Sequence, residues 1–245
     1  TMDKPFCMRH YALMQGACAM RISTDALFLG AWARTAHTAS QVLDVGTGTG
    51  ILSLMLAQTY PNAMVTAIDI DDEAVRTAQD NFSRSPYSNR LTALSCDITA
   101  PELALSPRHY DLIISNPPYY DGLQPATASL RQARHTGEGF APHLLFRYLE
   151  PFVAPEPTIC LVTPVEALPL LRREAVLHRY NLTRLCELHH QVGQPAIRLL
   201  TQWHRSATPP EPCRSESLAI RTAQQRYTAE ARDLLHPYLL DQYLT

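Results

Sequence analysis

The residues of this chain that are best suited to chemistry form one short motif, Asn116-Pro117-Pro118-Tyr119. The amide oxygen of Asn116 and the carbonyl oxygen of Pro117 are hydrogen-bond acceptors, and Tyr119 supplies a flat apolar face. Such a set suits a planar group that carries an NH2, with its hydrogens on the acceptors and its ring on the tyrosine. The two acceptors would pull the nitrogen toward a tetrahedral shape and direct its lone pair at an electrophile.

The two prolines of the motif also determine where it lies. Neither can donate a backbone hydrogen bond, and each pushes the residue before it out of the helical region. Residues 111–115 are largely apolar and β-branched, which predicts a buried strand that ends at Ser115. Asn116 then lies at the carboxyl edge of the sheet, where ligands bind in open α/β folds. A rigid loop that only closes the strand is the alternative, and Pro-Pro by itself would favour it.

A second informative stretch lies upstream, where a predicted strand over 41–45 is followed by a predicted helix over 51–58. Three alternating glycines join them: Gly46, Gly48 and Gly50. Glycines allow a tight turn and let a ligand approach main-chain N–H groups at a helix start. The spacing is G-x-G-x-G, unlike the dinucleotide fingerprint G-x-G-x-x-G, and Asp44 would repel a pyrophosphate. A cationic ligand without phosphate, such as S-adenosylmethionine, suits this loop better.

Two further carboxylates follow predicted strands. Asp69 ends the strand predicted over 64–70, at about the twenty-residue spacing of a ribose-binding acid. Capping of the next helix, predicted over 72–82, is its alternative role. Asp97 ends the strand predicted over 91–98, where it could accept from an adenine amine or simply form a turn. Because parallel strands end at the same edge, we expect both carboxylates near Asn116.

The composition is that of an ordinary globular protein, with 46% hydrophobic and 18% charged residues. The formal net charge of −2 argues against nonspecific coating of nucleic acid. No apolar run reaches the length of a membrane span, and no signal-peptide pattern is present. The six cysteines are scattered, without the spacing of a zinc site or a disulfide framework. We therefore expect a cytoplasmic protein without a metal or a membrane partner.

Strand and helix patterns alternate through the chain, which predicts an α/β fold with a doubly wound parallel sheet. Two segments, 182–191 and 196–205, are expected to form a hairpin that closes the sheet antiparallel. We expect a single domain over 1–245. Its parts are an N-terminal arm and helix over 1–37, with an irregular start, a core over 38–205 and a C-terminal extension over 206–245.

A cluster of basic residues follows the central motif. Arg131, Arg134 and His135 lie in a segment rich in Gly, Ala, Ser and Thr. Such a segment is typical of a substrate-facing loop, and the cluster could bind a phosphate backbone. A solvated charged face is the alternative.

These motifs together point to a family. Residues 44–50 resemble the cofactor loop of class I S-adenosylmethionine-dependent methyltransferases. The motif 116–119 is similar to the catalytic motif of the branch that methylates exocyclic amino or amide nitrogens. Residues 18–33, read with 115–120 and the later basic cluster, resemble the bacterial tRNA adenine-N6 methyltransferases that modify the adenine next to the anticodon of a valine tRNA. The resemblance covers nearly the whole chain.

The resemblance implies a Rossmann-like fold with a seven-stranded, mostly parallel sheet and an antiparallel closing strand. It implies a monomer or weak dimer that binds S-adenosyl-L-methionine and the anticodon loop of a tRNA. The implied catalytic residues are Asn116, Pro117, Pro118 and Tyr119. The implied cofactor-binding residues are Asp44, Gly46, Gly48, Gly50, Asp69, Asp97 and Asn116. The implied substrate-binding residues are Arg131, Arg134 and His135.

Three rival functions remain open at this point. A protein glutamine-N5 methyltransferase shares the motif 116–119 but usually carries an additional helical domain at its start. A guanine-N2 methyltransferase acting on ribosomal RNA is the second rival. The third is an NAD-dependent oxidoreductase, which the glycine spacing and Asp44 disfavour.

Overall fold

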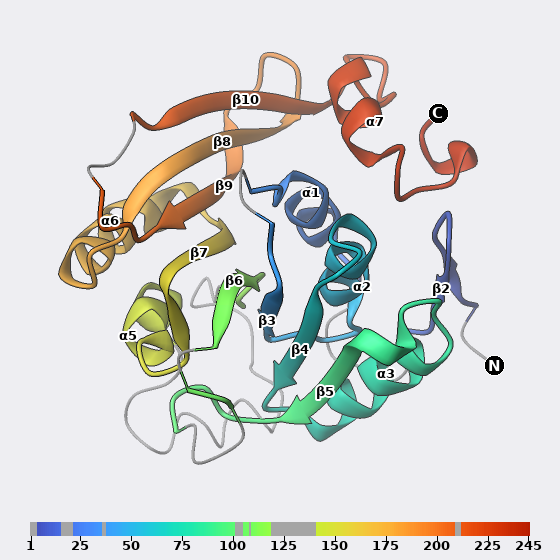
Figure 1. The fold of residues 1–245 in the computed structure, drawn as a ribbon. Coiled ribbons are helices and arrows are strands. Elements are labelled where there is room, and N and C mark those ends of the chain that lie inside the picture. Colours follow the sequence, from blue (N-terminus) through green and yellow to red (C-terminus); the bar gives the residue numbers. More distant parts are fainter. Residues whose placement is uncertain are drawn as a thin grey trace.

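One mixed sheet with helices on both faces forms the centre of the protein (Figure 1). The computed structural model describes residues 4–15, 22–35, 38–100, 105–107, 109–118, 141–208 and 212–245. Within these ranges, no helix is both long and apolar enough to cross a membrane.

The elements follow the strand-helix alternation that the sequence predicts. The strands of the main sheet are β3 (Gln41–Val45), β4 (Met64–Asp69), β5 (Leu91–Ser95), β6 (Tyr110–Ser115), β7 (Val153–Thr163), β8 (Asn181–Gln191), β9 (Ala196–His204) and β10 (Arg214–Arg221). The α-helices are α1 (Thr24–Trp32), α2 (Ile51–Thr59), α3 (Asp72–Ser83), α5 (Leu145–Leu149), α6 (Leu168–Leu177) and α7 (Ala229–Leu235). Short 3₁₀ turns lie at Ser88–Arg90, Pro142–Leu144, Val165–Ala167 and Asp241–Tyr243.

The order of the strands creates a switch point in the middle of the sheet. The order is β10-β8-β9-β7-β6-β3-β4-β5, and every described pair is parallel except those that involve β9. The chain runs outward from β3 through β4 to β5 and then crosses back to β6, on the other side of β3. The carboxyl ends of β3 and β6 therefore flank the crevice in which doubly wound sheets bind their ligands.

Alternating side chains of the central strands divide the core into two layers. Leu112 and Ile114 of β6 belong to a buried cluster that also contains residues of α1, α2, α3 and α7. Ile113, between them, belongs to a second cluster with residues of α5 and α6. Successive side chains of a strand point to opposite faces, so a strand that is apolar throughout must be covered on both. Figure 1 shows these two groups of helices on opposite sides of the sheet.

The sheet has eight described strands, where seven were expected. The additional strand is β10, which pairs parallel with β8 from Arg214 opposite Arg184 to Arg221 opposite Gln191. The first half of β10 is polar and mostly exposed, so its side chains carry little strand signal in the sequence. Its pairing with β8 supplies backbone hydrogen bonds that the side-chain pattern does not indicate. The predicted hairpin of β8 and β9 is confirmed.

The expectation of an irregular start is wrong for part of the N-terminal segment. Strands β1 (Phe6–Cys7) and β2 (Ala12–Leu13) form a small antiparallel hairpin. Arg9 ties this hairpin to the C-terminal segment, because its guanidinium donates to the carbonyl oxygen of Leu239 at 2.9 Å and to Asp241 at 2.6 Å. Two-residue strands carry no periodic signal, and the contacts of Arg9 join residues more than 200 positions apart.

Candidate active site

The carboxyl ends of four neighbouring strands lie level at one edge of the sheet. Ser115 of β6 pairs with Val45 of β3, Val45 pairs with Ile68 of β4, and Asp69 pairs with Ser95 of β5. The loops that follow these strands begin with Asn116, Gly46, Ile70 and Cys96. The structure thus places Asn116 and the predicted carboxylates along one edge, as expected.

The glycine loop turns sharply after β3. Gly46, Gly48 and Gly50 have φ values of 74°, 55° and 84°, a region that side chains disfavour. A Cβ atom built on Gly50 would lie 2.5 Å from Cε1 of Phe82, so helix α3 packs against this glycine too closely for a side chain. A Cβ atom on Gly46 would meet nothing within 4 Å. Gly46 is therefore needed for its backbone conformation and leaves open space beside the loop.

Asp44 lies buried beneath this loop and fixes its shape. Its Oδ2 accepts hydrogen bonds from the hydroxyls of Thr47 and Ser53, both at 2.7 Å. Its Oδ1 is buried and has no hydrogen-bond partner among the described residues. Burial raises the pKa of Asp44 to about 6, against the lowering effect of the two hydroxyls. A buried carboxylate with one unsatisfied oxygen favours a positively charged ligand nearby.

Asp69 holds the next turn of the loop. Its Oδ2 accepts from the backbone N–H of Gly48 at 2.9 Å, and its Oδ1 accepts from that of Asp71 at 3.0 Å. Burial raises the pKa of Asp69 despite these bonds. The alternative role of Asp69 as a helix cap is not what the structure shows, because Asp71 caps α3 by accepting from Glu73 N at 2.9 Å.

Asn116 is held at the end of β6 by a side-chain contact. Its Nδ2 donates to Oγ of Ser23 at 3.3 Å, and Ser23 is the N-terminal cap of α1. The adjacent Ser115 donates from its buried hydroxyl to the carbonyl oxygen of Val45 at 2.7 Å. The start of α1, the end of β6 and the end of β3 therefore meet at this point. Of the residues predicted to act here, Tyr119, Arg131, Arg134 and His135 lie outside the described residues.

Comparison with known proteins identifies the family. The family model of the methyltransferase small domain matches residues 24–136. A protein of Porphyromonas gingivalis, named tRNA1(Val) (adenine(37)-N6)-methyltransferase, is 34% identical over 95% of this chain and 94% of its own length. A protein of the same name from Tolumonas auensis is 37% identical over 92% of each chain. This chain belongs to that family of methyltransferases. The sequence-based identification is thereby confirmed.

Solved structures show that the methyltransferase fold is shared far beyond this family. A predicted O-methyltransferase from Agrobacterium tumefaciens superimposes with a TM-score of 0.68 at 17% identity, over 87% of this chain and 96% of that one. Geranyl diphosphate methyltransferase gives a TM-score of 0.54 at 9% identity, over 74% of this chain and 76% of that one. At such low identities the likeness concerns the fold alone, and it confirms the predicted Rossmann-like class.

The charges at the edge of this methyltransferase suit a cationic donor. The predicted carboxylates all lie there: Asp44 and Asp69 on β3 and β4, and Asp97 two residues after the end of the neighbouring β5. Asp97 forms the expected turn, in which its Oδ1 accepts from the backbone N–H of Thr99 at 2.9 Å and from its hydroxyl at 2.7 Å. Its Oδ2 has no hydrogen-bond partner within the described ranges. S-Adenosylmethionine, which carries an ammonium, a sulfonium and no phosphate, fits this set of residues.

One candidate residue was missed by the sequence analysis. Ile70, directly after Asp69, is 49% exposed at the carboxyl edge of the sheet. An exposed isoleucine beside a ribose-binding candidate could cover one face of a flat ring such as adenine. Its only signal in the sequence is that it is apolar within the acidic run 69–72.

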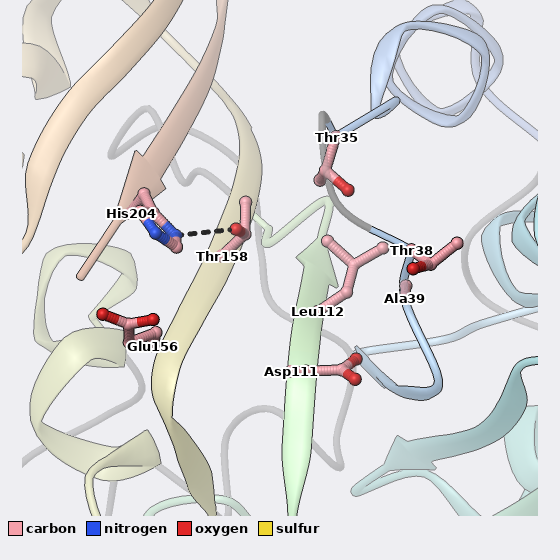
Figure 2. Close-up of a pocket in the computed structure, with 8 residues that line it drawn as sticks. All are labelled: Thr35, Thr38, Ala39, Asp111, Leu112, Glu156, Thr158 and His204. Carbon is pink, nitrogen blue, oxygen red and sulfur yellow. Dashed lines mark hydrogen bonds between the residues drawn. The ribbon is translucent and has the colours of Figure 1, made fainter. Parts of the chain in front are cut away.

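A cavity of about 110 Å³ lies at the opposite edge of the sheet of this methyltransferase (Figure 2). It is lined by Thr35, Thr38, Ala39, Asp111, Leu112, Glu156, Thr158 and His204. Asp111 already accepts from the backbone and hydroxyl of Ser40, and the hydroxyl of Thr158 lies 3.0 Å from Nδ1 of His204. Asp111 is the second residue of β6 and lies about 13 Å along the strand from Ser115. This cavity is therefore separate from the candidate active site.

Proposed function

We propose that this methyltransferase transfers the methyl group of S-adenosyl-L-methionine to the exocyclic N6 of an adenine in tRNA, the adenine next to the anticodon of tRNA(Val). The observation that carries the proposal is the identity of 34 to 37% with relatives of that printed name, over more than nine tenths of each chain. The arrangement of the candidate site supports it, because the glycine loop and Asn116 directly follow adjacent strands at the switch point.

On the donor side, the residues of this chain bind and orient S-adenosylmethionine. Bound S-adenosylmethionine supplies a methyl group activated by its attachment to a positively charged sulfur. We propose that Asp69 and Asp97 accept from the ribose hydroxyls and the adenine amine, with the backbone of Gly46 and Gly48 beside the ligand and Asp44 supporting the loop from below. Because these side chains are acidic, they favour a cation and disfavour a pyrophosphate.

On the acceptor side, Asn116 and Pro117 prepare the amine. An exocyclic amine is a poor nucleophile, since its lone pair is delocalised into the ring. Hydrogen bonds from its two hydrogens to Oδ1 of Asn116 and to the carbonyl oxygen of Pro117 favour a tetrahedral nitrogen whose lone pair points away from both acceptors. The proposed role of Tyr119 is to stack on the target base. A base in a single-stranded loop can be splayed into such a site without opening a duplex.

The proposed partner is the anticodon loop of a tRNA, contacted by Arg131, Arg134 and His135. We propose a monomer or weak dimer that acts in the cytoplasm. A guanine-N2 or protein glutamine-N5 methyltransferase would use the same acceptors on a different amine. The names of the relatives favour the tRNA adenine over both.

The test is identification of the methylated product. Purified protein is incubated with S-adenosylmethionine and total bacterial tRNA from a strain that lacks the enzyme, and the tRNA is digested and analysed by mass spectrometry. The proposal requires N6-methyladenosine. N2-methylguanosine, or methylated glutamine in added protein with unmodified tRNA, would contradict it. Thermal shift with S-adenosylhomocysteine and with NAD tests the alternative of an NAD-dependent oxidoreductase. Only S-adenosylhomocysteine should stabilise the protein.

A further inference from the structure

The N-terminus of helix α1 lies against the side-chain amide of Asn116. Its N-terminal cap, Ser23, accepts from the backbone N–H of Ala26 at 3.1 Å and from Nδ2 of Asn116 at 3.3 Å, both through Oγ. The two hydrogen bonds have different consequences: the first starts the helix, as a cap does. The second joins the helix to a residue 93 positions later in the chain.

This contact involves the nitrogen end of the Asn116 amide. An asparagine amide has an oxygen that accepts and a nitrogen that donates, and a half-turn about the last side-chain bond exchanges them. With the oxygen toward a substrate amine, a hydrogen bond forms; with the nitrogen there, two donors face each other. In the structure, Oγ of Ser23 accepts from Nδ2, and Oδ1 is the atom left for the substrate.

We propose that Ser23 is a positioning residue for methyl transfer, which holds the amide of Asn116 with its oxygen toward the target amine. This inference rests on the proposed function, since it assigns to Ser23 the orientation that the proposed role of Asn116 requires. Ser23 acts through Asn116 and need not touch the substrate.

The support behind Ser23 is rigid. In the first turn of α1, Oδ2 of Asp25 accepts from Nε of Arg198 on β9 at 2.9 Å. In the following turn, Phe28 and Leu29 are completely buried in the core. The start of α1 is therefore fixed both to the sheet and to the core, and Ser23 cannot follow Asn116 if the amide turns.

The first comparison uses Ser23→Gly and Ser23→Thr. Glycine is nearly as good as serine at a helix N-terminus, so Ser23→Gly removes the partner of Asn116 while α1 stays capped. Loss of one ordinary hydrogen bond predicts a fall of about fivefold in kcat for tRNA methylation. Affinity for S-adenosylhomocysteine should not change. Ser23→Thr keeps the hydroxyl and should restore most of the activity. Thr228→Gly, which removes the cap of α7 and the bond of the same hydroxyl to the carbonyl oxygen of Ala219, is the control and should leave kcat unchanged.

The second comparison repeats Ser23→Gly in the Asn116→Asp background. A carboxylate has two equivalent oxygens, so it has no wrong orientation to be prevented. Removal of the serine hydroxyl should then cost less than about twofold in the residual kcat, compared with about fivefold beside asparagine. This difference between backgrounds is not expected if Ser23 only stabilises the helix.

Two results would overturn the inference: an unchanged kcat in Ser23→Gly, or the same loss in both backgrounds. Both are measured against active wild-type protein. Absence of tRNA methylation by the wild-type protein is a different result, because it contradicts the proposed function itself.

Discussion

The hydroxyl of Ser115 donates a hydrogen bond to the carbonyl oxygen of Val45 at 2.7 Å. This bond joins β6 to β3 at their last residues, immediately before Asn116 on one strand and Gly46 on the other. The acceptor motif and the donor loop are therefore connected by one buried side chain. The sheet and this bond together set the distance between the acceptor motif and the donor loop. Methyl transfer between two bound molecules requires such a fixed distance.

Replacement of Ser115 by alanine should weaken both stability and transfer. Loss of a buried hydrogen bond predicts a decrease of about 1 to 2 kcal/mol in the free energy of unfolding, and thus a melting temperature lower by about 2 to 5 °C. We expect kcat for tRNA methylation to fall in the same variant. Ser83→Ala is the matched control, because Ser83 donates only to Asp80 in its own exposed helix end. A lower melting temperature with unchanged kcat would show that the bond has no role in positioning.

Asn116→Ala should abolish methylation and leave cofactor affinity largely intact. The amide oxygen acts on the target amine, whereas the predicted donor contacts come mainly from the glycine loop and the carboxylates. Single-turnover methylation measures the first effect, and calorimetry with S-adenosylhomocysteine measures the second. Asn89→Ala, at an exposed position outside the site, serves as the control. Turnover equal to that of the wild-type protein would refute the assignment of Asn116.

Asp69→Ala should weaken binding of the donor. A carboxylate that accepts from two ribose hydroxyls makes charge-assisted hydrogen bonds, so its loss predicts an increase of about ten- to a hundredfold in Kd for S-adenosylhomocysteine. The variant also loses the bonds that hold Gly48 and Asp71. Calorimetry is compared with Asp80→Ala, which removes an exposed acid from α3. An unchanged Kd in Asp69→Ala would exclude the predicted role.

The buried carboxyl of Asp44 should make stability depend on pH in a defined direction. Its pKa rises from 3.8 to about 6 on folding. Between these values the folded protein holds a proton that the unfolded chain has released. The stability contributed by this group therefore falls as the pH rises through that range and stays low above it.

Comparison with Asp44→Asn isolates this effect, since asparagine does not titrate. From pH 5 to pH 8, the wild-type protein should lose on the order of 1 kcal/mol of unfolding free energy relative to the variant. Asp69, whose pKa is also raised, is present in both proteins and largely cancels in the difference. Chemical denaturation of both proteins at several pH values measures this difference in unfolding free energy. A difference that stays constant with pH would mean that Asp44 does not titrate in this range.

The edge of the site could be predicted from the sequence because strand ends carry local signals. Two prolines after an apolar run end β6, alternating glycines end β3, and Asp69 lies at the spacing of a ribose-binding acid. Parallel strands then bring these residues to one edge without further information. The assignment of each role to Asn116, Asp44, Asp69 and Asp97 stays a prediction.

Features that depend on distant partners could not be predicted. The contact between Ser23 and Asn116 joins residues 93 positions apart, and a serine before a helix indicates only a cap. Strand β10 shows too few apolar residues to be recognised over its full length, because its partner β8 supplies the pairing. The hairpin of β1 and β2 depends on Arg9 and on the C-terminal segment in the same way.

Methylation of two defined tRNAs measures the central claim most directly. One transcript is tRNA1(Val) with adenine next to the anticodon, and the other differs only by guanine at that position. With S-adenosylmethionine in excess, the first should gain about one N6-methyladenosine per molecule, as the single target implies, and the second none. Equal methylation of both transcripts, or of neither, would contradict the account.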